Sequence, residues 1–312
     1  MSTRGETYTD ETGLTVYYAH DGEYRRNGSL PDKHLTLPEG LLTFERLCAD
    51  NGVPLLSDTE IRDIAKSGRL DGEKLFGFQF GDNQRSKGSC NGQAVRGAVE
   101  TARVRRGEPP VLLSGPYAYS LMNGNRDNGS ALSAGLVVCR DRGICRREVV
   151  PQWDQIYRNT YDTRAADADA LRFKGFMPYP VTTLQGFWTG LALGYDGICA
   201  VHAGGNFDRV NAKGIVGVDN GSGNHAVRCD GIVWDDNFGP VGTGVNSWGT
   251  GYGRGGRMNL HTGHFNQTFR YHQFWILPST IDDPNDAHKP PQLVFPELTG
   301  GDPRKAPTLV GI

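Results

Sequence analysis

The sequence predicts an α+β fold, in which helices and strands are grouped in different parts of the chain. Within residues 81–277, apolar residues at helical spacing are concentrated in the first half, and short β-type runs follow in the second half. No internal repeat or heptad pattern runs along the chain. Such segregation of helices from strands favours an α+β architecture over an alternating, parallel α/β sheet.

Length and composition narrow the class of protein. A chain of 312 residues suits one two-lobed unit with extensions. Its 33 basic and 35 acidic residues nearly cancel, so we expect no nucleic-acid partner. No apolar stretch approaches the ~20 residues that span a bilayer, and residues 1–20 lack the apolar core of a secretory signal. We therefore expect no membrane association, no Sec-type signal peptide, and a cytoplasmic or virion-associated (particle-associated) location.

The chain divides into three unequal parts. Residues 1–80 form a polar, turn-rich N-terminal extension, and residues 81–277 form the dense body. Within the body, we expect a helical lobe over 81–195 and a β lobe over 196–277. Residues 278–312 are a proline-rich tail, because proline cannot continue a helix or the middle of a sheet.

Two helices and several strands can be placed within these parts. The Ser57 to Glu60 spacing is a capping box and Gly68 a stop, which predicts a helix between them. A second helix begins at Cys90 and ends near Gly107, because alanine and valine recur there at helical spacing. Strands are predicted in the runs ICAVHA, GIVGVD, HAVRCDGIVW, GTGVNSW, RMNL and FWIL.

Cys90 is a candidate nucleophile because it opens a predicted helix. The positive end of the helix dipole favours thiolate over thiol. Gly88 and Ser89 are small enough for a substrate backbone to approach the sulfur, and the Gln84 amide could donate to an oxyanion formed there. The alternative is a buried cysteine at a helix start.

His225 is the candidate general base. It precedes a run of alternating apolar and polar residues, which predicts a strand after a glycine-rich turn. That position would place the imidazole at a cleft. His202 is its rival, at the end of another predicted strand. A metal pair of Cys199 and His202 is conceivable, but zinc sites need three or four ligands. We therefore expect no metal, with His202 structural or lining a subsite.

Asn246 is the candidate that orients the base. Its carboxamide oxygen could accept a hydrogen bond from the imidazole N–H and fix the ring without neutralising a Cys–His ion pair. Trp248, two residues on, could shield that bond from water and strengthen it. The alternative is a glycine-rich hairpin with a core tryptophan.

Together these stretches resemble the papain family of cysteine peptidases. The matching residues occur in the family's order Gln, Cys, His, Asn: Gln84, GSC at 88–90, HAV at 225–227 and NSWGTGYG at 246–253. His225 and Asn246 follow Cys90 by 135 and 156 residues, near the family's spacing.

The resemblance implies both a fold and an activity. The fold would have a helical lobe with Cys90 and a β-barrel-like lobe with His225 and Asn246, and a peptide or protein substrate would bind between them. The enzyme would hydrolyse peptide bonds through a Cys90 thiolate and His225, with Gln84 and the Cys90 N–H as the oxyanion hole and no cofactor. By the same resemblance, the segment LSGPYAYSLMNGNRDNGSALSAG would supply subsite walls.

The sequence departs from the family pattern in three places. Lys87 replaces the usual cysteine three residues before the nucleophile, so that disulfide cannot form, which agrees with a reducing compartment. Asn91 replaces the usual aromatic residue and predicts a more polar pocket. Residues 1–80 lack the long helical pattern of the family's inhibitory propeptides.

Six cysteines are too sparse for a disulfide scaffold, and a pair between Cys139 and Cys145 stays open.

Two other functions remain alternatives to the peptidase. The chain could be a structural or binding component of a larger assembly, such as a virion, with residues 1–80 and 278–312 meeting an assembly partner. It could also hydrolyse cell-wall peptides, as related Cys–His enzymes do.

Overall fold

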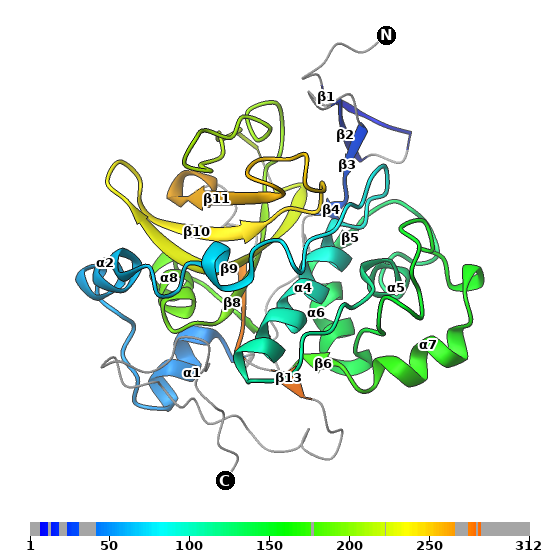
Figure 1. The fold of residues 1–312 in the computed structure, drawn as a ribbon, viewed down its shortest axis with the longest axis horizontal. Helices are drawn as coiled ribbons and strands as arrows, with labels where there is room; N and C mark the ends of the chain where they lie inside the picture. The colour runs from blue at the N-terminus through cyan, green and yellow to red at the C-terminus, as the bar shows by residue number, and fades with distance from the viewer. Residues whose placement is uncertain are drawn as a thin grey trace.

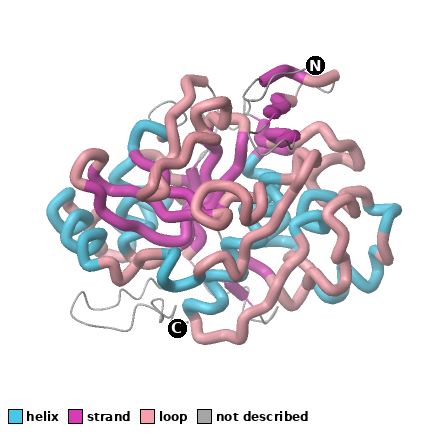
Figure 2. Tube along the Cα trace, turned by 45° about the horizontal axis from the view of Figure 1, so that its top comes forward, coloured by secondary structure: helices cyan, strands magenta, loops and turns pink. Residues whose placement is uncertain are grey.

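The computed structural model describes the chain in eight stretches: 7–11, 14–18, 24–30, 42–175, 178–221, 223–265, 274–278 and 280–281. The predicted α+β architecture is confirmed. Figure 1 shows a strand-rich half and a helix-rich half side by side, and Figure 2 shows the same grouping along the trace.

A six-stranded antiparallel sheet forms the strand-rich half, in the order β11-β10-β9-β8-β12-β7. Its strands are β7 (Tyr179–Pro180), β8 (Asp196–Val201), β9 (His225–Asp235), β10 (Gly239–Val245), β11 (Arg257–His261) and β12 (Phe274–Leu277).

The predicted strand GIVGVD does not form. Only isolated bridges join Ile215 to Asn259 and Val210 to Val216. The Asn211 side chain accepts from the backbone N–H of Lys213 and of Ile215, which holds a turn around the first residues of the run, so no continuous ladder starts there.

The helices lie on both sides of this sheet. On one face lie α1 (Phe44–Asp50), α2 (Asp58–Ser67) and α8 (Leu184–Ala192). On the other face α3 (Gly72–Phe76) packs where the Gly72 N–H donates to Thr243 Oγ1 and the Arg105 guanidinium lies over the Phe76 ring. The helix-rich half holds α4 (Cys90–Arg105), α5 (Gly115–Ser120), α6 (Leu132–Val137) and α7 (Thr163–Ala170), with a π-helical turn at Val138–Arg142. Short 3₁₀ turns occur at Arg158–Thr160 and Thr262–His264.

Among the described residues, seven short strands lie outside the main sheet. The N-terminal sheet contains β1 (Thr7–Thr9), β2 (Thr15–Tyr18) and β3 (Tyr24–Asn27). Then β4 (Ser29–Leu30) pairs in parallel with β5 (Ser130–Ala131), and β6 (Lys174–Gly175) pairs with β13 (Thr280–Ile281). Apart from Pro278 and β13, the predicted tail 278–312 lies outside the described residues.

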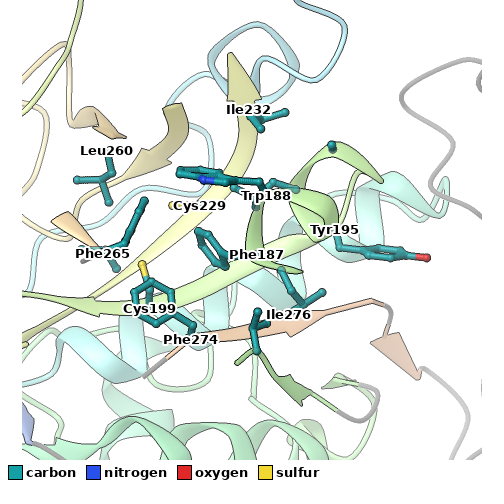
Figure 3. Packing of buried hydrophobic residues seen from close by; sticks show 14 of the residues in the cluster. Phe187, Trp188, Tyr195, Cys199, Cys229, Ile232, Leu260, Phe265, Phe274 and Ile276 are labelled. Atoms are coloured by element: carbon teal, nitrogen blue, oxygen red, sulfur yellow. The ribbon is translucent and has the colours of Figure 1, made fainter. Parts of the chain in front are cut away.

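The sheet separates two apolar cores. Alternate residues of β8 point to opposite faces, so Cys199 and Val201 enter one core while Ile198 and Ala200 enter the other. Figure 3 shows the first core, where the rings of Phe187, Trp188 and Phe265 pack edge to face or tilted.

Helices of the predicted extension share the first core. Phe44 and Leu47 of α1 and Ile61 of α2 are buried there with residues of the sheet. The boundary at residue 80 stays a prediction. The predicted helix cap is confirmed: Ser57 and Glu60 form the capping box, and Gly68 ends α2 in the left-handed conformation.

Helix α4 is buried on nearly all sides, whereas its sequence predicted a single apolar stripe. It is enclosed by β8, β9 and α5, so its polar side chains also face protein. They are accommodated by charge pairing: Arg96 donates to Glu100 at 2.8 Å, and Arg105 donates to Asp196 at 2.8 Å.

Replacing Asp196 by alanine should destabilise the fold by about 3–5 kcal/mol, because the Arg105 guanidinium would stay buried without its carboxylate. The two side chains are 0% and 2% exposed. The free energy of unfolding in urea measures the effect. Asp50→Ala is the matched control, since its exposed pair with Arg46 contributes ~0–1 kcal/mol. Equal losses in the two variants would contradict the account.

None of the described helices is long and apolar enough to cross a membrane.

Candidate active site

The Cys90 sulfur lies where the helix-rich half meets the sheet. Cys90 is the first residue of α4, as predicted, and its side chain is 0% exposed. The backbone N–H of Ala226 donates to its Sγ at 3.4 Å, which brings the sulfur beside the start of β9. Two segments distant in sequence thus meet at this point.

His225 is the first residue of β9 and is held by Asn246. Its Nε2 lies 2.8 Å from Asn246 Oδ1, which also accepts from the Ser247 N–H at 2.8 Å. Among the described residues, the other ring nitrogen, Nδ1, has no hydrogen-bond partner. The bond therefore fixes the imidazole and leaves Nδ1 available for a proton.

Aromatic rings enclose the His225–Asn246 pair. The Trp248 ring is tilted against the imidazole, with the centroids 5.0 Å apart, and Trp248 is 1% exposed. Phe207 meets both His225 and Trp248 edge-on. The sequence predicted the place of Trp248 but not Phe207, which lies in a loop without periodicity.

Gln84 has its amide orientation fixed by its neighbours. Its Oε1 accepts from the Ser247 hydroxyl, so its Nε2 faces the opposite way. That nitrogen donates to the backbone carbonyls of Lys87 and Arg26, both at 2.8 Å. The amide that the sequence predicts as an oxyanion donor is therefore occupied by a carbonyl of the chain's own N-terminal part.

Residues 26–30, here called the strap, cross over Cys90. The Gly28 C=O accepts from Ser130 N at 2.8 Å, and the Ser29 N–H donates to Asn224 O at 2.9 Å. The Asn27 side chain donates to Ala203 O at 2.9 Å. Figure 1 shows β4 of the strap beside β5, near the start of α4.

The strap fits closely against the residues before Cys90. A Cβ atom built on Gly28 would lie 1.9 Å from the Gly88 carbonyl oxygen, so only glycine fits there. The sequence predicted that Gly88 permits a close backbone approach, and in the structure the approaching backbone is the strap. No pattern in the sequence marks the strap, because an extended segment without a regular face carries no periodicity.

Burial sets the proton affinities of the pair. Burial raises the pKa of the Cys90 thiol, and backbone N–H groups of Ala226, Gly28 and Asn91 oppose that rise. Burial lowers the pKa of His225 to about 4, and its bond to Asn246 opposes the fall. With the strap in place, the pair is therefore neutral thiol and neutral imidazole near pH 7.

The fold should lose stability as the pH falls from about 6.5 to 4. Unfolding returns the pKa of His225 from about 4 to 6.5, so below pH 6.5 the unfolded chain binds the extra proton. His225 contributes about 3 kcal/mol of this loss at the acid end, and His264, whose pKa burial also lowers to about 4, adds to it in parent and variant alike. Urea unfolding at pH 7 and 4.5 measures it. His225→Gln, which does not titrate, should lose about 2–3 kcal/mol less than the parent; parallel pH dependences would refute the assignment.

Asn91 and Lys87, the two single-residue departures from the family pattern, both have partners. Asn91 is fully buried, and its Nδ2 donates to Ser130 Oγ at 3.1 Å and Ala131 O at 2.7 Å. It thus holds the strand that pairs with the strap. Lys87 Nζ lies 3.9 Å from Asp127.

The remaining candidates are not part of this pair. Cys139 and Cys145 are free and buried. Cys199 is buried in the core with its thiol hydrogen-bonded to that of Cys229. His202 is half-buried directly after Val201, the strand partner of His225. In the described stretches, no group of three or more His, Cys, Asp and Glu side chains is placed to hold a metal ion.

Comparison with known proteins places this fold. No protein-family profile matches the sequence, and no curated protein matches it. The structure, however, is similar to a ragweed pollen cysteine protease, Amb a 11, in its proform, with a TM-score of 0.57 and 18% identity over 83% of this chain and 77% of that one.

Two further solved structures agree with that likeness. One is procathepsin B S9 from Trypanosoma congolense, with a TM-score of 0.57 and 11% identity over 82% of this chain and 86% of that one. The other is a digestive procathepsin L 3 of Tenebrio molitor, with a TM-score of 0.50 and 17% identity over 64% and 65%. The chain has the papain-like fold of these cysteine proteases, as its sequence motifs predicted.

Proposed function

We propose that this protein is a cysteine peptidase that hydrolyses peptide bonds. The observation that carries the proposal is the arrangement around His225. Its Nε2 is held by Asn246 Oδ1 at 2.8 Å. Cys90, at the start of α4, accepts a hydrogen bond at its Sγ from the N–H of Ala226, the residue after His225. A base fixed in this way beside a thiol is the arrangement needed to activate a nucleophile.

The reaction would run through an acyl-enzyme. Cys90 gives its proton to His225 Nδ1, and the sulfur bonds to the substrate carbonyl carbon. Gln84 Nε2 and the Cys90 N–H donate to the resulting oxyanion. The C–N bond then breaks as His225 protonates the leaving amine. Finally a water, deprotonated by His225, attacks the thioester, which releases the acid and restores the thiol.

The same proposal includes a closed state. With the strap in place, Cys90 is buried and the Arg26 carbonyl occupies the Gln84 donor, so no substrate carbonyl reaches the sulfur. We infer that displacement of the strap precedes catalysis. The described similar structures include a proform and two procathepsins, which supports such a closed form.

Hydrolysis of a peptide library by a strap-displaced chain tests the activity. Gly28→Val displaces the strap for the steric reason given above. In that background we expect peptide cleavage that Cys90→Ala abolishes, whereas Cys48→Ala, which removes a buried thiol in α1, retains it.

Other outcomes would replace the proposal. Cleavage of cell-wall muropeptides but not of the library would favour a cell-wall peptide hydrolase. Absence of cleavage in both assays, together with failure of Cys90 to react with a peptidyl epoxide, would favour a structural component of an assembly.

A further inference from the structure

The basic side chain of Arg26 is bound to Asp127, close to Cys90. The backbone carbonyl of Arg26 accepts from Gln84 Nε2, and its side-chain Nη1 donates to Asp127 Oδ2 at 2.7 Å. Both side chains are largely removed from water, at 15% and 9% exposed. The strap therefore shows how a peptide carrying arginine can meet Asp127 beside Cys90.

Asp127 is held in position by residues near Cys90. Its Oδ1 accepts from the Gly88 N–H at 2.9 Å and from the Tyr119 hydroxyl at 3.1 Å. The Tyr119 hydroxyl accepts in turn from the Gly129 N–H at 2.9 Å, next to the β5 strand that pairs with the strap. These bonds anchor one carboxylate oxygen and leave Oδ2 directed at the bound guanidinium.

Other charges near Arg26 do not replace Asp127. Asp10 accepts from Arg26 Nε at 2.7 Å, but it belongs to the N-terminal segment and is not part of the body that holds Cys90. Lys87 Nζ lies 3.9 Å from Asp127 Oδ2, beyond hydrogen-bond distance, and rests 5.8 Å from the Trp153 ring centroid. When Arg26 leaves, Lys87 stays as an ion-pair partner of Asp127 at 3.9 Å, a distance that leaves Oδ2 free to accept a hydrogen bond from an incoming guanidinium.

We propose that Asp127 is a specificity-determining residue, which selects peptides with an arginine or lysine at or beside the residue that supplies the scissile carbonyl. This inference rests on the proposed peptidase function. A charge-assisted bond in a partly desolvated site favours a basic side chain over a neutral one of similar length.

Matched peptide pairs test the inference in the Gly28→Val background. Each pair carries arginine or glutamine at one of the three positions around the scissile bond, and the readout is the ratio of kcat/KM within the pair. We expect arginine to be favoured about tenfold or more at one position. Asp127→Asn should bring that ratio close to one, and Asp127→Lys should favour glutamate there. Asp154→Asn, at an exposed carboxylate of the same half, should keep the parent ratio.

The outcomes separate this inference from the function beneath it. The inference is overturned, while the peptidase stands, if the Gly28→Val chain cleaves both peptides of every pair equally. It is also overturned if adding Asp127→Asn keeps the arginine preference. Equal cleavage by the Gly28→Val chain overturns the inference even where an Asp127 variant fails to fold. If the Gly28→Val chain cleaves no peptide and its Cys90 takes no epoxide, the proposed function itself fails.

Discussion

Replacing Gly28 by valine is expected to raise the alkylation rate of Cys90 by about a hundredfold. The added Cβ would lie 1.9 Å from the Gly88 carbonyl oxygen and 2.4 Å from its carbon, which are backbone atoms that no rotamer change can move. The strap must then leave, and its bonds to Gln84, Ser130 and Asn224 are lost. At about 1 kcal/mol each, these three bonds account for roughly a hundredfold shift toward the open state.

The rate of iodoacetamide addition at pH 7, followed by mass spectrometry, measures this opening. The five other cysteines are buried elsewhere in the fold and should react slowly in both chains. Glu11→Val is the matched control, because Glu11 is exposed in the same N-terminal part. A Gly28→Val chain as slow as the control would mean that the strap does not cover the thiol.

Replacing Gln84 by alanine in the opened chain should lower kcat by about 10²–10³ and change KM little. The Gln84 amide donates to the Arg26 carbonyl at 2.8 Å in the closed state, so after opening it is placed to donate to the oxyanion of a substrate. Removing one such donor costs about that much in other enzymes, because the interaction strengthens as charge develops.

The control for Gln84 separates donation from loop shape. Asn83 lies next to it, and its Oδ1 accepts from the Arg85 N–H at 2.9 Å, which shapes the same loop. Asn83→Ala should therefore alter kcat far less than Gln84→Ala. Equal losses of kcat in the two variants would show that Gln84 acts only by shaping the loop.

The candidate site was predictable where each part is a local pattern. Helical spacing placed Cys90 at the start of α4, alternation placed His225 at the start of β9, and the NSWG run placed Asn246 beside it. Each of these signals lies within about ten residues, so propensity and periodicity detect it.

The parts that the sequence did not predict depend on contacts between distant residues. The strap closes over Cys90 because Gly28 meets Gly88 and Ser29 meets Asn224, and nothing in the sequence links those pairs. Asp127 gains its role only when Arg26 arrives. Likewise, the burial of charged residues on α4 depends on partners such as Asp196 on β8. Local sequence patterns carry no information on such pairings.

The central claim is that Cys90 is a catalytic thiol that the strap covers. Treatment of the full chain and its Gly28→Val variant with a peptidyl epoxide, followed by peptide mass mapping, tests this claim most directly. We predict one adduct, on Cys90, formed rapidly in Gly28→Val and slowly in the parent, and suppressed by His225→Ala. No adduct on Cys90 in the opened chain, or one that forms equally fast without His225, would contradict the account.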